Sequence, residues 1–400
     1  TTNRRISYME DKTEDDRYYI LTLIAIAKEL DTMKKEAVLC IAIGLAVLSV
    51  FWQPVDKNYF GYIDWNTLML LFCLMAAMAG FQRLGIFQKI GNFLLGAVKN
   101  TRSLLLILCF LPFFFSMLIT NDVALITFVP FGMIVLQMCK KERFVIPLVV
   151  LQTIAANMGS SLTPVGNPQN LYLYSQSGAA VGDFLLWMLP YTLVTGICIG
   201  LAVLFQKKEK VEYSPQKSNA VWGKKRKFYF VSYVVMFLCC LAGVSKILPP
   251  MSLFFLVLVF LLVADRKILC CIDYALLGTF VAFFIFIGNL GRVPAFRDFF
   301  AGILTGHETL AGVVSSQVIS NVPAALLLSG FTDKWESLVI GTNLGGLGTL
   351  IASMASLISY KQIVRQYPVL KGRYFLYFTL GNVGMLLILL GVYAGLGAIK

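Results

Sequence analysis

Amide side chains that could hold an ion interrupt one of the most apolar stretches of the sequence. The run from Asn157 to Asn170 carries three asparagines, one glutamine, two prolines and two glycines. Each backbone group that such a break frees costs several kcal/mol in hydrocarbon, unless it is buried in protein or lines a polar cavity. We therefore predict a broken transmembrane helix whose unwound middle is a binding site. The substrate-binding candidates are Thr163, Pro164, Gly166 and Asn167, and the candidates near a coupling cation are Asn157, Gly159 and Ser160.

The same pattern occurs a second time near the end of the chain. Asn343 to Thr349 repeats the spacing Asn-x-Gly-x-x-x-Thr of residues 157–163, and in that register Asn167 matches Ser353 and Asn170 matches Ser356. Small residues also recur in membrane helices simply because they pack closely, which is the alternative explanation. The second break adds Thr349 and Ser353 as substrate-binding candidates, and Asn343 and Gly345 as cation-binding candidates.

Two polar triplets lie between pairs of apolar arms. Thr120-Asn121-Asp122 divides the stretch from Leu104 to Gln137, and Ser320-Asn321-Val322 divides a later one. Each pair of arms fits either two complete spans or one re-entrant hairpin, and the short arms favour the hairpin. The hydroxyl and amide groups of Thr120, Asn121, Ser320 and Asn321 are substrate-binding candidates.

Asp122 is the acidic residue of these triplets. A carboxylate within a membrane is expensive and is by default a sign of function, here the binding of a coupling cation or proton. The alternative is a helix cap that accepts backbone N–H groups and does nothing else.

The composition requires a membrane protein. Hydrophobic residues make up 58% of the 400 residues and charged residues 14%, and the mean hydropathy is +0.77. A soluble chain of this length needs far more charge. The nine cysteines show no metal or disulfide spacing, and the single histidine, His307, argues against a histidine-based metal site. The sequence shows neither protease nor nucleotide-binding motifs.

Four motifs recur in the same order, including Ile63-Asp64-Trp65 and Ile272-Asp273-Tyr274. We therefore predict an all-α polytopic membrane protein of two inverted repeats, with about nine full transmembrane helices, two re-entrant hairpins and two broken helices. The expected segments are an N-terminal cytoplasmic arm (1–36), a first repeat (37–205), a basic cytoplasmic loop (206–227), a connecting span (228–247) and a second repeat (248–400). With the N-terminus in the cytoplasm, all but six of the 34 Lys and Arg residues fall on the cytoplasmic side.

The chain resembles the ion-transporter superfamily of citrate and dicarboxylate carriers, arsenite pumps and some sodium/proton antiporters. The resemblance covers about residues 37–398 and is most specific at Ile63-Asp64-Trp65, Asn121-Asp122-Val-Ala-Leu, Leu162-Thr-Pro-Val-Gly-Asn-Pro-Gln-Asn170 and Ser320-Asn321-Val-Pro-Ala324. The dicarboxylate carriers hold carboxylates with Ser-Asn-Thr triplets at the hairpin tips and flank sodium sites with them. Both triplets here keep the asparagine and the preceding hydroxyl but lack the final threonine. Asp122 after the asparagine is closer to the arsenite-pump branch.

The leading functional hypothesis is a secondary active transporter of a small citrate- or dicarboxylate-like anion, coupled to sodium or protons, that works by alternating access. The alternatives within the superfamily are arsenite or antimonite efflux and sodium/proton antiport; an intramembrane enzyme and a channel are further classes. We expect no cofactor other than Na⁺ or H⁺. The expected partners are the lipid bilayer, the anion, the coupling cation and a second copy of the chain in a homodimer, with no nucleic acid. The expected location is the inner or plasma membrane of the cell, with multiple spans and a cytoplasmic N-terminus.

Overall fold

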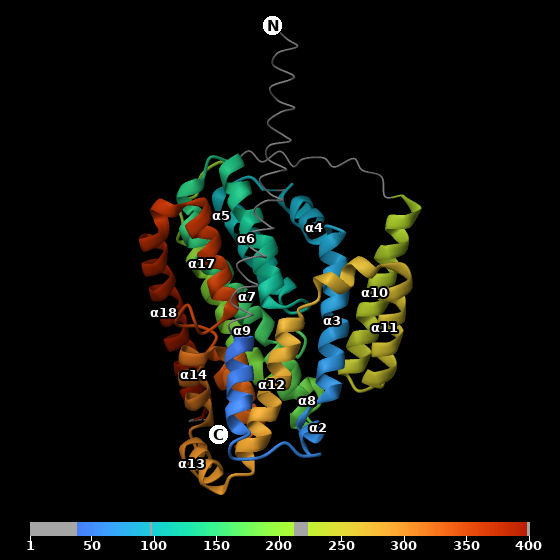
Figure 1. Cartoon of the computed structure of the whole chain (residues 1–400). Helices are drawn as coiled ribbons and strands as arrows, with labels where there is room; N and C mark the ends of the chain where they lie inside the picture. Colours follow the sequence, from blue (N-terminus) through green and yellow to red (C-terminus); the bar gives the residue numbers. More distant parts are fainter. Residues whose placement is uncertain (1–37, 97, 212–222, 398–400) are drawn as a thin grey trace.

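The described residues of the chain fold almost entirely into helices. The computed structural model describes residues 38–96, 98–211 and 223–397, and within these ranges it contains no strand, only an isolated bridge between Asn100 and Lys210 (Figure 1). The predicted N-terminal arm and much of the predicted basic loop lie outside the described residues. The prediction of an all-α chain is confirmed.

The helices follow one another with short connections. The first part of the chain forms a helix at Val38–Ser49, then α2 (Tyr59–Tyr62), α3 (Trp65–Arg83), α4 (Ile86–Leu95), α5 (Thr101–Phe115), α6 (Asn121–Met138), α7 (Val145–Ser161), α8 (Pro168–Ser177) and α9 (Val181–Leu204). The second part forms α10 (Lys224–Val244), α11 (Pro250–Ala264), α12 (Tyr274–Gly291), α13 (Pro294–Leu304), α14 (Glu308–Ile319), α15 (Asn321–Ser329), α16 (Trp335–Leu344), α17 (Met354–Gln366) and α18 (Lys371–Gly397). Short 3₁₀ turns lie at Glu142–Phe144, Arg266–Cys271 and Pro368–Leu370.

The lengths of the helices suit a bilayer. Seven helical segments of the described chain are long and apolar enough to cross a membrane, and three shorter apolar helices accompany them at Val38–Ser49, Thr101–Phe115 and Pro250–Ala264. Many of their large apolar side chains face outward, as lipid-facing residues do. The chain is therefore a polytopic membrane protein. The expected number of full crossings and the inverted relation of the repeats stay predictions.

Two pairs of neighbouring helices form hairpins. Arms α5 and α6 meet at residues 116–120 in the upper half of Figure 1, whereas α14 and α15 meet at Ser320, with α14 in the lower half. The residue that follows each tip, Asn121 or Asn321, is only 5% exposed. The arms therefore return from a buried tip, which is the hairpin arrangement.

Two longer helices are broken near their middle. The axis of α7 ends at Ser161, and α8 starts after an irregular segment at residues 162–167; likewise α16 ends at Leu344 and α17 starts after residues 345–353. Proline has no N–H and clashes with the preceding turn, so Pro164 and Pro168 explain the first break. In the second break Gly348 has a φ of +100°, which a residue with a side chain adopts rarely.

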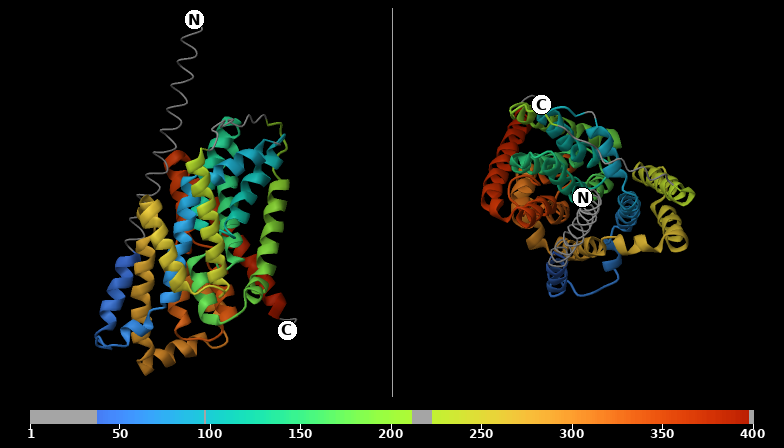
Figure 2. Two further views of the ribbon diagram at one scale, coloured as in Figure 1. Left: turned by 90° about the vertical axis from the view of Figure 1, so that its right-hand side faces the viewer. Right: turned by 90° about the horizontal axis from the view of Figure 1, so that it is seen from above.

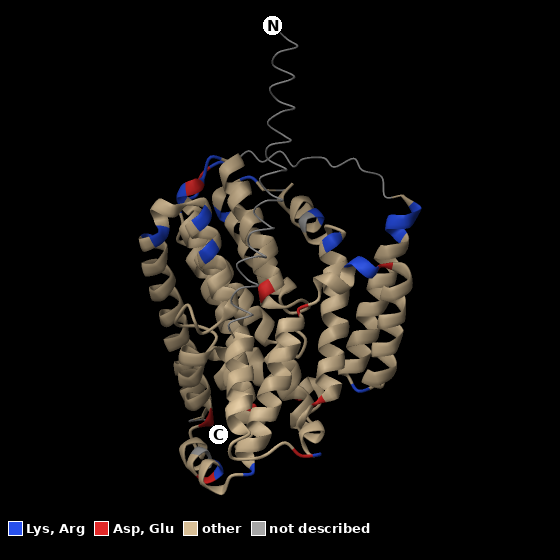
Figure 3. Cartoon of the chain, in the orientation of Figure 1, with Lys and Arg blue, Asp and Glu red and all other residues tan. Residues whose placement is uncertain are grey.

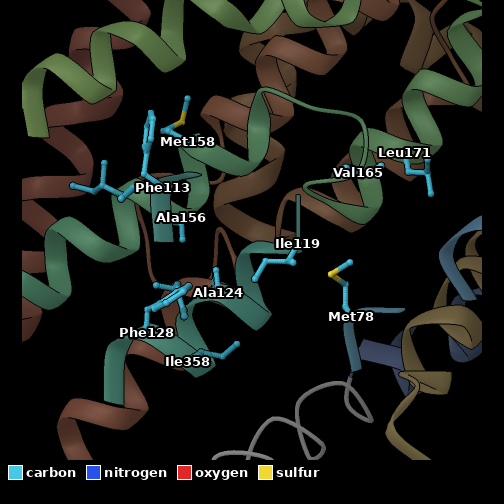
Figure 4. Close-up of a cluster of buried hydrophobic side chains, with 14 of the residues drawn as sticks. Met78, Phe113, Ile119, Ala124, Phe128, Ala156, Met158, Val165, Leu171 and Ile358 are labelled. Atoms are coloured by element: carbon cyan, nitrogen blue, oxygen red, sulfur yellow. The ribbon is translucent and has the colours of Figure 1, made fainter. Parts of the chain in front are cut away.

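Apolar side chains surround the first hairpin tip. Figure 4 shows Phe113, Ala124, Phe128, Met158 and Ile358 together, although they come from α5, α6, α7 and α17. All five are buried. This packing fixes the tip against both broken helices, which belong to different halves of the sequence.

A separate group of helices stands beside this core. In Figure 2, α10 and α11 lie at one side of the bundle, with α3 between them and the other helices. Asp265, only 7% exposed, holds the group together: Arg83 Nη1 donates to its Oδ1 at 2.5 Å and the Tyr233 hydroxyl donates to its Oδ2 at 2.8 Å. The Asp265 carboxylate, which directly follows α11, thus bonds both the end of α3 and the middle of α10.

The opposite end of the molecule has its own ties. Asn289 of α12 donates to the hydroxyl oxygens of Ser49 and Tyr59, both at 2.8 Å. Arg292 donates to Asp56 Oδ2 at 2.8 Å, and this hydrogen bond is the main reason that the pKa of the Asp56 carboxyl is lowered. These contacts attach the helix Val38–Ser49 and its following loop to α12.

The region around the basic loop differs from the predicted boundaries. Helix α10 begins at Lys224, so the last basic residues predicted for the loop form its first turn. Residues 206–211 of the predicted loop are also held in place, because Thr101 N donates to Glu209 O at 2.9 Å and Val211 N donates to Lys99 O at 3.2 Å. Glu209 in addition forms ion pairs with Lys141 and Arg143. Residues 206–211 therefore clamp the open end of the first hairpin to the start of α7.

Glycines allow each hairpin to approach its broken helix. A Cβ on Gly159 of α7 would overlap the carbonyl oxygen of Phe113 in α5, and a Cβ on Gly345 would lie 2.6 Å from the Ser316 hydroxyl at the end of α14. Ser116 is likewise the nearest side chain to Gly159. The two glycines, predicted to lie near a coupling cation, make the same packing contact in the two halves of the chain.

The carboxylate of Asp265 offers a test of the α3–α10–α11 group. Asp265→Asn keeps the shape but removes the charge that Arg83 and Tyr233 share, and we expect the free energy of unfolding to fall by about 1–3 kcal/mol. The measurement is thermal unfolding of the purified protein in detergent. Asp333→Asn, at an exposed aspartate, is the control; equal melting temperatures for both variants would contradict the role of Asp265.

The close approach at Gly159 offers a second test. In Gly159→Ala the added methyl group meets backbone, which cannot rotate away, so we expect a loss of about 1–3 kcal/mol of stability and a displaced hairpin. The matched control is Gly200→Ala in α9, where a Cβ meets nothing within 4 Å. Thermal unfolding and protease accessibility of the hairpin report the effect. A Gly159→Ala protein as stable as Gly200→Ala would show that the hairpin does not depend on this contact.

Candidate functional site

The first hairpin tip is tied to the first broken helix. Thr120 caps α6 with extended backbone, and Asn121 begins the helix. The Asn121 amide donates from Nδ2 to Asn157 Oδ1 at 2.9 Å, and its Oδ1 accepts from the backbone N–H of Asp122 at 2.9 Å. The positive end of the α6 dipole therefore lies at the tip, next to the end of α7.

The second tip is tied to the second break. Ser320 has a φ of +75°, a conformation that is strained for a residue with a side chain, and it turns the chain between α14 and α15. Asn321 N donates to Ala352 O at 2.9 Å, and the Ser320 hydroxyl donates to the same oxygen at 3.4 Å. The hairpin tip thus supplies hydrogen-bond donors to the Ala352 carbonyl, which lies in the unwound second break.

The two breaks contact each other through asparagines. Asn343 donates from Nδ2 to Asn170 Oδ1 at 2.7 Å, and Asn157 donates from Nδ2 to Ser356 Oγ at 3.4 Å. In the register that matches the two halves, Asn157 corresponds to Asn343 and Ser356 to Asn170. The two hydrogen bonds are therefore the same contact, made once in each direction across the centre of the molecule.

Matching residues also cap the half-helices that follow the breaks. Asn167 precedes α8 with φ −142° and ψ 147°, and Ser353 precedes α17 with φ −141° and ψ 138°. Each leaves a helix N-terminus at the centre of the protein. The Ser353 hydroxyl donates to Asn157 Oδ1 at 3.1 Å, so the second cap is fixed by the first broken helix.

A cavity of about 50 Å³ lies where the tips and the breaks meet. We call it the central cavity. Its lining from the tips and breaks comprises Asn121, Asp122, Asn167, Pro168, Gln169, Ser320, Asn321, Val322, Pro323, Ser353 and Met354, and Val38, Asp273, Leu276 and Thr279 complete it. The volume has room for a few water molecules.

A larger cavity of about 450 Å³ adjoins the central cavity. It runs along α3 from Leu71 to Gln82 and reaches the first hairpin tip and the start of α12. The two cavities share Asp122, Asn167, Pro168, Asp273 and Leu276. The central cavity therefore has a neighbouring space on the side of α3.

The predicted site residues divide into two groups. One group lines at least one of the two cavities: Thr120, Asn121, Asp122, Asn167, Ser320, Asn321 and Ser353. The other group lines neither of them: Asn157, Gly159, Ser160, Thr163, Pro164, Gly166, Asn343, Gly345 and Thr349.

The second group holds the site together. The Thr163 hydroxyl donates to Met117 O at 2.5 Å, which joins the first break to the first hairpin. The Ser160 hydroxyl accepts from Asn167 Nδ2 at 2.8 Å. The backbone N–H of Thr349 donates to Gln317 Oε1 at 2.9 Å. The asparagines of this group donate from their amide nitrogens to other protein groups.

Three polar residues of the central-cavity lining were not predicted. Asp273 lines both cavities, and Thr279 and Gln169 line the central one. Asp273 accepts from Leu276 N at 3.0 Å and so caps α12, just as Asp64 caps α3. The repeated Ile-Asp-aromatic motif was the signal for Asp273, but in a sequence such an aspartate looks only like a helix cap.

The lining suits hard cations and hydroxylated molecules. Carboxylates from Asp122 and Asp273 lie with amide and hydroxyl groups, and among the described residues neither lining includes Lys, Arg or His. Oxygen ligands of this kind coordinate sodium or accept protons. The described part of the chain has no group of three or more His, Cys, Asp and Glu side chains that could hold a metal ion.

Comparison with known proteins agrees with this architecture. The sequence profile of a family described as "Citrate transporter" matches residues 21–332. An uncharacterized transporter of Methanocaldococcus jannaschii is 30% identical over 336 residues, which cover 83% of this chain and 90% of the relative. The inner membrane protein YbiR of Escherichia coli is 30% identical over 330 residues, covering 81% and 86%. A silicon efflux transporter of Oryza sativa is 29% identical over 163 residues, covering 40% and 33%.

The family and its relatives are transporters rather than enzymes, and the helices of this chain suit a bilayer. The chain is a multi-pass membrane transporter and belongs to the citrate transporter family.

Proposed function

We propose that this protein is a secondary active transporter that moves a small oxygen-bearing solute by alternating access, coupled to a sodium ion or a proton at Asp122. The observation that carries the proposal is the central cavity itself. Both hairpin tips and both helix breaks contribute to its lining, although they lie far apart in the sequence. Broken helices that meet around a midplane site are typical of such carriers.

The position of the larger cavity and the contacts on the other side of the tips favour alternating access over a fixed pore. The larger cavity follows α3 toward its C-terminal end, whereas on the other side of the tips α8 packs against the start of α3 through a hydrogen bond from Gln176 Nε2 to Asp64 Oδ2 at 2.8 Å. Lys and Arg gather at the upper end of the molecule (Figure 3). By the positive-inside rule this end faces the cytoplasm, so the larger cavity lies on the cytoplasmic side of the hairpin tip.

Two carboxylates support coupling to a cation. Asp122 comes from the first turn of α6 and Asp273 from the cap of α12, and both line both cavities. A cation bound between these elements would join the hairpin to the helix beside it. A proton on either carboxyl would do so through a hydrogen bond. Occupancy of the site by either ion depends on the concentration of that ion on the side to which the site is open, and this couples the site to the gradient across the membrane.

The same features bear on the solute. The family description and the neutral amide donors of Asn121 and Asn321 support a citrate- or dicarboxylate-like anion bound with its cation. The two carboxylates and the volume of about 50 Å³ favour a smaller solute of little negative charge, as in efflux of a neutral oxyacid, or sodium/proton antiport. The similarity to a silicon efflux transporter supports this second class. The geometry supports the smaller solute better than a tricarboxylate.

Uptake and efflux in proteoliposomes test these proposals. The protein is reconstituted and offered citrate, succinate, arsenous acid and silicic acid, each with and without a sodium gradient and a pH gradient. Gradient-driven movement of one of these solutes, or of sodium against protons, is expected. Equilibration that ignores both gradients would reject coupled transport and favour a channel.

Asp122→Asn tests the coupling ion. The variant keeps the shape and most of the capping ability of the side chain but removes the charge, so we expect accumulation driven by a gradient to fall at least tenfold while exchange or binding survives. The matched control is Asp183→Asn, which changes another aspartate in the first turn of a helix, α9, away from both cavities. Unchanged accumulation with unchanged sodium and pH dependence in Asp122→Asn would reject its coupling role.

A further inference from the structure

Gln169 lines the central cavity, and none of the hydrogen bonds described above involves its side chain. Its side chain is 0% exposed to solvent, yet it lines the central cavity. Within the described part of the chain neither Nε2 nor Oε1 has a hydrogen-bond partner. A buried amide that makes no hydrogen bond costs free energy at both its donor and its acceptor.

The other amides of the first break have hydrogen-bond partners. Asn121 and Asn157 bond each other, Asn167 donates to Ser160 Oγ, and Asn170 accepts from Asn343. Each of these amides is fixed by protein groups. Gln169 is thus the amide of the first break for which the described protein groups supply no hydrogen-bond partner.

The local sequence explains why Gln169 reaches the cavity. Asn167 is extended and Pro168 is the first residue of α8, so Gln169 lies in the first turn of that half-helix. The matching position in the second break is Ala355, which is also fully buried but has no polar group. The pair Gln169 and Ala355 therefore breaks the symmetry of the site, as Asp122 and Val322 do.

We propose that Gln169 binds the transported solute through an O–H group: Nε2–H donates to an oxygen of the solute, and an adjacent O–H of the solute donates to Oε1. This inference rests on the proposed transport function. It names the solute class as hydroxylated molecules and protonated oxyacids, because a single small solute satisfies both the N–H and the C=O of a primary amide only if it both accepts and donates. A fully ionised carboxylate accepts only, and it would leave Oε1 without a partner.

The test compares solutes that differ by one hydroxyl group. Dissociation constants of citrate against tricarballylate, of malate against succinate, and of boric acid are measured by calorimetry on the purified full chain. Wild-type protein is expected to bind the hydroxylated member of a pair about ten- to a hundredfold more tightly, since the analogue leaves a buried polar group unpaired. In Gln169→Leu the ratio is expected to fall to within about twofold.

The matched control is Gln362→Leu in α17. Gln362 is also buried with both amide atoms unpartnered in the described part of the chain, but it lines neither cavity. Gln362→Leu should keep the wild-type preference. A preference that survives in Gln169→Leu, that is lost equally in Gln362→Leu, or that is absent from the wild type overturns the inference, as does failure of every probe to bind.

Different results would reject the role of Gln169 and the proposed transport function. Gradient-driven transport without a hydroxyl preference would support the transport function and reject the role of Gln169. A hydroxyl preference that depends on Gln169, in a protein that shows no gradient-driven transport, would leave the binding site and reject coupled transport.

Discussion

The structure depends on satisfying the polar groups that helix breaks expose inside an apolar bundle. A helix that ends in the middle of a membrane protein frees N–H and C=O groups that lipid cannot bind. Here amide side chains supply partners for these groups: Asn170 donates to three carbonyls of its own break, and Asn157 donates to the Gly346 carbonyl of the other break at 3.4 Å. The side-chain hydrogen bonds from Asn343 to Asn170 and from Asn157 to Ser356 then tie the two breaks to each other across the centre. The site is therefore a consequence of folding the two halves together.

Near-symmetry of the halves makes their differences informative. Residues that hold the backbone recur, such as Asn157 with Asn343 and Gly159 with Gly345, because both halves face the same physical problem. Asp122 and Gln169 do not recur, since Val322 and Ala355 replace them. Structural need does not require these two polar side chains, as the second half folds without them. Their position in the first half assigns the distinctive chemistry of the cavity to the first hairpin and to α8.

The sequence predicted what depends on local chemistry. Proline and glycine in an apolar run located the breaks, and an asparagine between short apolar arms located the hairpin tips. What it could not give were roles that depend on contacts across the fold. Gly159 and Gly345 belong to helix packing, which no spacing in one segment reveals. Asp273 looked like a cap because it is one, and only the tertiary structure brings that cap to Asp122. Gln169 was part of a predicted motif, but its unpartnered amide is visible only once every neighbour has been paired.

The walls of the cavities belong to parts of the fold that are held together separately. On one side Asp265 joins α3, α10 and α11; on the other Glu209 clamps the first hairpin to α7. Between these parts, α8 contacts the first group at the lower end, where Gln176 donates to Asp64 and Lys246 lies 5.5 Å from the centre of the Tyr174 ring. Such partly exposed polar contacts are weak. In the proposed alternating-access cycle, the larger cavity would close and the lower contacts would open. The hydrogen bonds of Asp265 and Glu209 lie within each part, so a motion of the two parts relative to each other leaves them intact.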